Sequence, residues 1–68
     1  MLIHFSEHVG TSYVEGCIRE IEEMGALVEP QDKLTFSANV LKPRNYPFVV
    51  DFLRHEERIG NLRLELEE

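Results

Sequence analysis

The side chains best suited to hold a metal ion stand near the start of this 68-residue chain, where His4 and His8 flank Glu7 and the single cysteine, Cys17, follows. Imidazole, carboxylate and thiolate are the usual zinc ligands in proteins. Along an extended strand His4 and His8 are about 13 Å apart, too far for one tetrahedral site unless the chain turns after Ser6. We therefore expect no metal and no cofactor, and we interpret Cys17 as a small buried apolar residue without a disulfide partner.

The hydroxyl side chains are the other candidate reactive groups, and each has a structural interpretation. Ser6 and Ser37 belong to strand faces, and Thr11 and Ser12 stand at a helix start. A catalytic site needs a nucleophile or a base with a positioned partner in a pocket. The thin core of so short a chain leaves little volume for a pocket. We expect that the protein is not an enzyme.

Two groups of residues are candidates for binding a small ligand or an anion. Gly10, Thr11 and Ser12 begin the first predicted helix, and Lys42 and Arg44 precede the second. Free N–H groups at a helix start, beside positive side chains, favour an anion or an acidic partner segment. A solvated basic loop is the alternative interpretation of Lys42 and Arg44.

The charge of the chain limits its partners. Seven basic and thirteen acidic residues give a formal net charge of −6, and the acidic residues are spread from Glu7 to Glu68. Direct binding to nucleic acid needs the opposite sign, so we expect none. No basic segment followed by a long apolar run is present, so we predict neither a signal peptide nor a membrane span, and we expect a cytoplasmic protein. Without a repeat or linker, residues 1–68 form one predicted domain.

An amphipathic helix is predicted over residues 11–25. Ser12 and Glu15 have the spacing of a capping box, and Gly25 is a typical stop. Apolar residues at spacings of three and four form a single stripe of Val14, Cys17, Ile18, Ile21 and Met24. Gly16 is expected on the face opposite this stripe, where it either admits a neighbouring molecule or has no role.

Alternating apolar and polar side chains predict strands over residues 2–6, 34–40 and 62–67. A shorter strand over residues 26–29 would complete a hairpin, with Pro30 at the second position of a turn over 30–33. Without that strand the sheet would have three strands.

A second helix is predicted from Asn45, its cap, to about Glu57, with Pro47 in the first turn. Its apolar stripe consists of Tyr46, Val49, Val50 and Leu53. Phe48 and Phe52 extend the apolar arc toward the side that should face solvent.

The order strand, helix, strand, strand, helix, strand is the split βαβ arrangement of an α+β protein. Right-handed crossovers place both helices on one face of an antiparallel sheet. The inward-facing set is then Ile3, Phe5, Leu34, Phe36, Ala38, Val40, Leu62, Leu64 and Leu66. The opposite, polar face carries His4, Ser6, Thr35, Ser37, Asn39, Arg63 and Glu65.

In this order of elements the whole chain resembles the ferredoxin-like superfold, which implies a fold and no particular activity. The residues that three activities of that superfold require are absent from this sequence. The first loop, residues 7–11, has neither the cysteine pair of heavy-metal carriers nor the arginine of acylphosphatases. The outward residues of the central strands are small and polar, whereas RNA-recognition domains need aromatic residues there.

The first loop and helix are also similar to those of ACT-type regulatory domains. The similarity covers residues 6–10 and then Val14, Ile18, Ile21 and the segment Gly25-Ala26-Leu27-Val28. It implies a small-molecule site at a subunit interface, with Gly10 as the glycine of the first loop.

We predict an interaction or assembly module that is a homodimer, a larger homo-oligomer or a small subunit of a larger complex. Chains this short bury little surface and usually need a disulfide, a metal or a partner subunit. The apolar surplus of the second helix makes Phe48, Phe52 and His55 the predicted interface. A regulatory domain that senses a small molecule or an anion is one alternative, and an acidic inhibitor that mimics nucleic acid is another.

Overall fold

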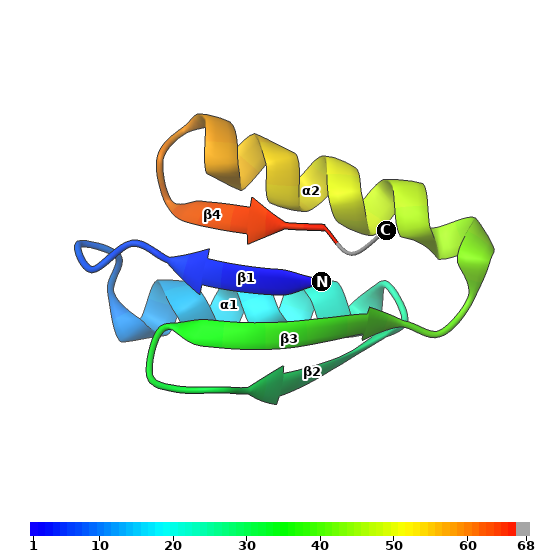
Figure 1. Ribbon diagram of the computed structural model, residues 1–68, viewed down its shortest axis with the longest axis horizontal. Coiled ribbons are helices and arrows are strands. Elements are labelled where there is room, and N and C mark those ends of the chain that lie inside the picture. The colour runs from blue at the N-terminus through cyan, green and yellow to red at the C-terminus, as the bar shows by residue number, and fades with distance from the viewer. Residues whose placement is uncertain (67–68) are drawn as a thin grey trace.

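The structure is a computed structural model that describes residues 1–66. Within them lie β1 (Leu2–Phe5), α1 (Thr11–Glu23), β2 (Ala26–Pro30), β3 (Thr35–Val40), the short 3-10 helix η1 (Pro43–Asn45), α2 (Tyr46–Arg58) and β4 (Leu62–Glu65). The strands form one antiparallel sheet in the order β2-β3-β1-β4 (Figure 1). This is the predicted ferredoxin-like α+β arrangement, and it includes the short strand that the sequence left open.

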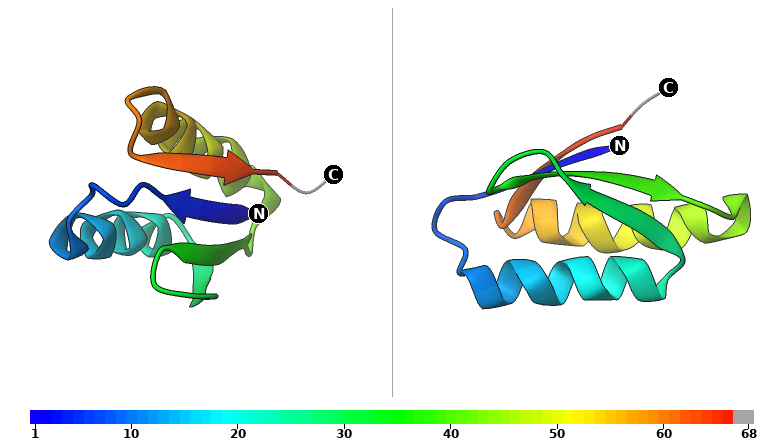
Figure 2. Two further views of the ribbon diagram at one scale, coloured as in Figure 1. Left: turned by 60° about the vertical axis from the view of Figure 1, so that its left-hand side comes forward. Right: turned by 90° about the horizontal axis from the view of Figure 1, so that it is seen from below.

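Both helices lie on the same face of the sheet and run side by side in opposite directions (Figure 2). α1 lies behind the central strands β1 and β3 in the view of Figure 1, and α2 lies next to β4. The central strands are covered by the helical layer, since Ile3 and Phe5 of β1 and Ala38 of β3 are buried.

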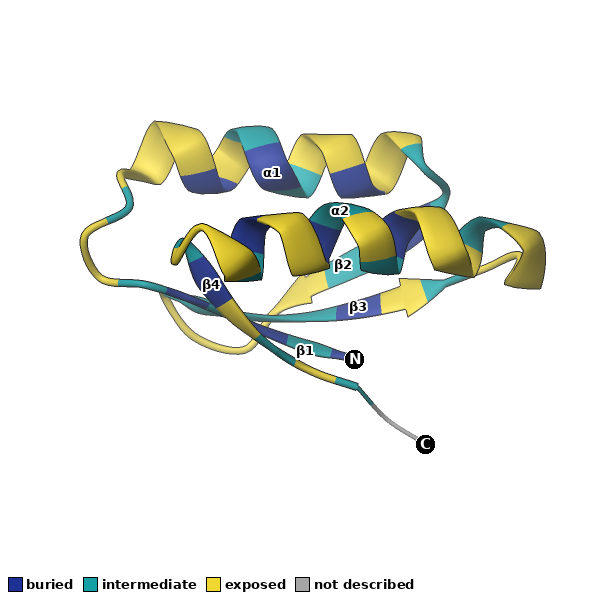
Figure 3. Cartoon of the chain, turned by 90° about the horizontal axis from the view of Figure 1, so that it is seen from above, coloured by how far each residue is buried: buried dark blue, intermediate teal, exposed yellow. Residues whose placement is uncertain are grey.

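The core fills the layer between the sheet and the helices. Its four largest fully buried side chains are Ile3, Ile21, Val49 and Leu53. The other predicted inward residues are buried or pack partly buried against this core. The outer surfaces of both helices are mostly exposed (Figure 3). The alternation of the strands and the stripes of the helices therefore predicted the core, except that Tyr46 of the predicted α2 stripe is 40% exposed.

The predicted residues make the uncovered face of the sheet mostly polar, although the exposed Leu27 of β2 lies opposite Asn39 on it. His4 lies opposite Thr35 on β3 and Arg63 on β4, and its Nδ1 is 3.4 Å from Thr35 Oγ1. Arg63 Nη1 donates to Glu65 Oε1 at 2.7 Å, and this hydrogen bond holds the pKa of Glu65 below its ordinary value. Such exposed pairs contribute little to stability.

The predicted capping box of α1 is wrong. The helix begins at Thr11, its N-cap is Gly10 in extended backbone, and no side chain caps it. The Gly10 carbonyl accepts hydrogen bonds from the N–H groups of Tyr13 and Val14. Ser12 therefore already lies inside the first turn, where its hydroxyl cannot act as the cap.

Two predictions around the other turns also need correction. Pro30, predicted at the second position of a turn, is the last residue of β2. Asp32 closes the turn that follows: its Oδ1 accepts hydrogen bonds from the N–H groups of Leu34 and Thr35 at 3.0 and 2.8 Å. Asn45 is the N-cap of α2, but its side chain caps nothing. Its backbone is helical because it continues directly from η1, so the side chain is not placed to cap the next turn.

The ends of the predicted elements differ slightly from the observed ones. β4 ends at Glu65, and Glu67 of the predicted last strand lies outside the described residues. In residues 1–66, neither helix has the length and apolar character required to cross a membrane.

Candidate functional site

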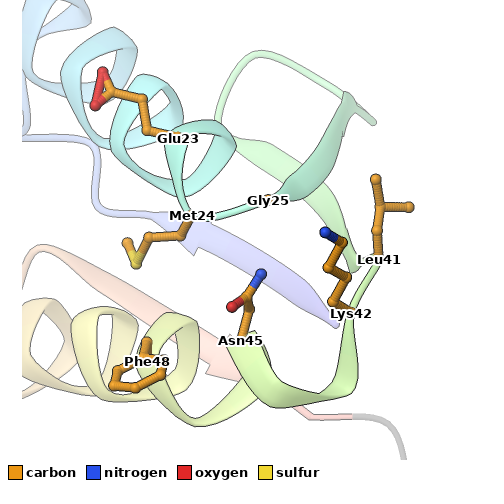
Figure 4. A pocket seen from close by; sticks show the side chains of 7 residues that line it. All are labelled: Glu23, Met24, Gly25, Leu41, Lys42, Asn45 and Phe48. Carbon is orange, nitrogen blue, oxygen red and sulfur yellow. The ribbon is translucent and has the colours of Figure 1, made fainter.

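Two hollows, which have no lining residue in common, lie where α1 and α2 face each other. The first, the Gly16 hollow, has a volume of about 290 Å³ and is lined by Ser12, Tyr13, Gly16, Cys17, Glu20, Phe52 and Glu56. The second, the Phe48 hollow, has a volume of about 310 Å³ and is lined by Glu23, Met24, Gly25, Leu41, Lys42, Asn45 and Phe48 (Figure 4). Phe48 and Phe52 are one turn apart on α2, so the hollows follow one another. Together they are the interhelical groove.

The α2 wall of the groove is apolar and partly exposed. Phe48 is 64% exposed and Phe52 packs partly buried against the core. With His55 and the exposed Ile59, these residues recur at spacings of four, three and four. That spacing places them on one flank of the helix, beside the buried stripe of Val49 and Leu53. The predicted interface residues therefore share one side of α2.

The α1 wall has a gap where a side chain is missing. Gly16 is half-buried, and a Cβ atom added to it would meet no atom within 4 Å. Gly16 lines the Gly16 hollow, and the helical spacing directs it away from Val14 and Ile21 of the apolar stripe, as predicted. Four exposed acidic residues and one exposed basic residue stand on the same helix: Glu15, Glu20, Glu22 and Glu23, and Arg19.

The end of the groove near the start of α1 is fixed by a buried carboxylate. Glu56 is only 6% exposed. Its Oε1 accepts hydrogen bonds from the hydroxyl of Tyr13 and from Asn61 Nδ2, the latter at 3.0 Å, and Cys17 Sγ lies 4.0 Å away. These contacts tie α1 to α2 and to the residue before β4. The cluster therefore sets the distance between the groove walls.

Two pKa values show how this cluster behaves. The hydrogen bond to Glu56 raises the pKa of Tyr13 to about 12. Burial, followed by the charge of Glu56, raises the pKa of the Cys17 thiol to about 11. The nucleophile of a cysteine is its thiolate, so Cys17 is protonated and inert near neutral pH. The cluster is a structural support for the groove.

Sequence reasoning missed Glu56, although a signal was present. Glu56 follows Val49 and Leu53 at the spacing of the buried stripe of α2. A carboxylate at such a position needs hydrogen-bond partners. Tyr13 and Asn61 are far away in the sequence, and only the packed fold brings them to it.

The five predicted ligand-binding residues do not form one site. Gly10 and Thr11 line a third cavity, the hairpin cleft, of about 630 Å³; its other lining residues are Glu7, Val9, Val14, Glu15, Lys33, Leu34 and Phe36. Ser12 belongs to the Gly16 hollow and Lys42 to the Phe48 hollow, while Arg44 is exposed on η1. The start of α1 and the loop before α2 lie at opposite ends of the molecule (Figure 1).

In the part of the chain that the structure describes, no three histidine, cysteine, aspartate or glutamate side chains come together to hold a metal ion. His4 belongs to the uncovered face of the sheet, and His8 is exposed in the loop after β1.

No protein-family model, curated protein or solved structure matches this chain. The ferredoxin-like class therefore rests on the topology, and any function has to be argued from the geometry of the groove and the hairpin cleft.

Proposed function

We propose that this protein is an interaction module that binds another protein chain through its interhelical groove. The observation that carries this proposal is the exposed ring of Phe48, which lines the Phe48 hollow. The neighbouring Gly16 hollow is open, and its surface is mostly apolar. Leu41, 57% exposed, stands in the same hollow as Phe48. Neighbouring exposed apolar side chains of this kind mark contact surfaces for proteins or ligands.

The size of the chain supports the same proposal. A chain of this length buries about 60% of the surface that its unfolded form exposes, which leaves a thin stability margin. Cys17 is a free thiol, so a covalent cross-link does not supplement the core. A bound chain would stabilise the fold by mass action. The bound chain is either a second copy, as in a homo-oligomer, or a different subunit.

Affinity capture from the cells that make the protein tests this proposal. We expect the wild-type chain to retain a discrete partner, and we expect Phe48→Ser to lose it because the ring no longer fills the contact. Asn39→Ser is the matched control, since Asn39 is exposed on the uncovered face of the sheet. Equal capture by the wild-type chain and Phe48→Ser would contradict the proposal. Phe52 is a poorer probe because it also packs against the core.

The hairpin cleft supports a second candidate function, a sensor of a small molecule or an anion. It is the largest of the three cavities, and it combines the apolar side chains of Val14 and Phe36 with Lys33. Thermal unfolding in the presence of amino acids, phosphate and nucleotides tests this candidate. A ligand at 100 times its dissociation constant adds ~2.7 kcal/mol to the free energy of unfolding. The absence of a shift with every compound would contradict it.

A further inference from the structure

We infer that the occupant of the interhelical groove is a cationic amphipathic helix of a different protein, an inference that rests on the proposed function. The groove follows α1, whose 13 residues span about 20 Å at 1.5 Å per residue. An amphipathic helix of similar length fits such a groove by placing anchor side chains one turn apart. The Gly16 and Phe48 hollows are the places for two such anchors.

The close approach of a helix depends on Gly16. A helix residue without a side chain lets a neighbouring backbone come near, and glycine costs about 1 kcal/mol in a helix interior relative to alanine. Nothing in residues 1–66 fills the space above Gly16. The chain therefore carries a poor helix former at a point of α1 where a docked helix needs room.

The charges around the groove select the sign of the occupant. The exposed Glu20 of α1 lines the Gly16 hollow, and the exposed Glu23 and Lys42 line the Phe48 hollow. The excess negative charge of the groove therefore lies at the Gly16 hollow. The facing wall of α2 is formed by Phe48 and Phe52. A helix with lysine or arginine on one side and leucine-like residues on the other matches both walls. Complementary charge also speeds association.

A second copy of this chain suits the groove less well. Each copy has a formal net charge of −6, and a net charge far from zero opposes self-association. The helix α1 of a second copy would bring its own four exposed glutamates toward Glu20 and Glu23. The charge pattern therefore favours a foreign cationic helix.

Three synthetic peptides of about 16 residues, long enough to form a helix when bound, test this inference against the purified full chain. The first is an amphipathic helix of leucine and lysine, the second replaces every lysine by glutamate, and the third scrambles the first. We expect the first to bind at least about tenfold more tightly than the others. Its affinity should fall as the salt concentration rises, because salt screens exposed charges. Amide chemical shifts should change at residues lining the groove.

Variants of the chain locate the binding site. Gly16→Leu fills the Gly16 hollow without meeting other atoms at its Cβ, so the fold should remain and binding should weaken at least about tenfold. Glu20→Lys should weaken binding of the leucine–lysine helix. Glu29→Lys, which changes the net charge equally on β2, is the matched control and should not. Circular dichroism checks that each variant folds.

Four outcomes overturn the inference. Tight binding of the leucine–glutamate helix would contradict the sign of the charge, and unchanged binding by Gly16→Leu would contradict the location. A stable dimer of the purified chain in light scattering would make a second copy the occupant, and the proposed function would stand. If no peptide binds, the inference fails. Photo-cross-linking from position 48 in cells then tests the proposed function separately: a protein adduct would support it, and no adduct would contradict it.

Discussion

Gly16 and Gly25 differ in backbone conformation and surroundings, and alanine should have opposite effects at the two positions. Gly16 has ordinary helical geometry and open space beside it, so Gly16→Ala should raise the free energy of unfolding by about 1 kcal/mol. Gly25 has a φ of +91° and stands close to Asn45, so Gly25→Ala should lower it by about 1 kcal/mol. Urea denaturation measures both changes. A loss of stability in Gly16→Ala would mean that the space above Gly16 is filled.

Tyr13 provides a pH-dependent test of the cluster that supports the groove. Its pKa is raised from 10.0 to about 12 by the hydrogen bond to Glu56. A pKa that is higher in the folded state stabilises the fold below the unfolded value, and this stability is lost as the pH rises from 10 to 12. Stability should therefore fall over that interval in the wild-type chain and fall less in Tyr13→Phe.

The titration of Tyr13 can be observed directly. The chain has two tyrosines, so in Tyr46→Phe the tyrosinate absorbance reports Tyr13 alone. We expect a midpoint near 12 in the folded variant and near 10 in urea. A folded-state midpoint near 10 would show that the hydrogen bond to Glu56 is absent in solution.

At the scale of the elements, the β4 edge of the sheet is partly covered by α2. On β4 the N–H group of Leu64 donates to Glu57 Oε2 at 3.0 Å, so a side chain of α2 occupies part of this edge. That N–H group is then not available for pairing with another strand. This contact argues against the edge of β4 as the contact surface and leaves the helical layer as the better candidate.

Replacing Glu57 by alanine should free this edge. We expect Glu57→Ala to lower the free energy of unfolding by about 1 kcal/mol, since a half-buried N–H group loses its partner. Self-association at high protein concentration should rise because Leu64 can then pair with another strand. Glu29→Ala, an exposed glutamate on β2, is the control and should change neither quantity. A Glu57→Ala variant as stable and as monomeric as the wild-type chain would show that the contact is weak.

The regular patterns of the sequence predicted the elements well, and the local chemistry of their ends less well. Alternation over residues 34–40 and the stripe around Val14 and Ile21 each specify a buried face, and the structure buries both. The capping box failed because Ser12 with Glu15 fits the motif in sequence, while Gly10 already accepts the first helical hydrogen bonds. Local motifs compete at helix ends, whereas a buried face is fixed by many residues at once.

At the scale of the whole molecule, the groove belongs to the helical layer that covers one face of the sheet (Figure 2). Its lining comes from both helices and from the segments next to them. The apolar arc of Phe48 and Phe52 was visible in the sequence. Room for a neighbouring molecule at Gly16 was one of two interpretations of the sequence. The support by Glu56 was not visible, since it depends on contacts between α1 and α2.

The measurement that tests the groove as a contact surface most directly is site-specific photo-cross-linking in the cells that make the protein. A photoreactive phenylalanine analogue replaces Phe48 in one variant and Asn39, on the uncovered sheet face, in the other. We predict a discrete adduct from position 48 and none from position 39. The added mass identifies a second copy, of 7.9 kDa, or a different protein. No adduct from position 48, or the same adducts from both positions, would contradict the account.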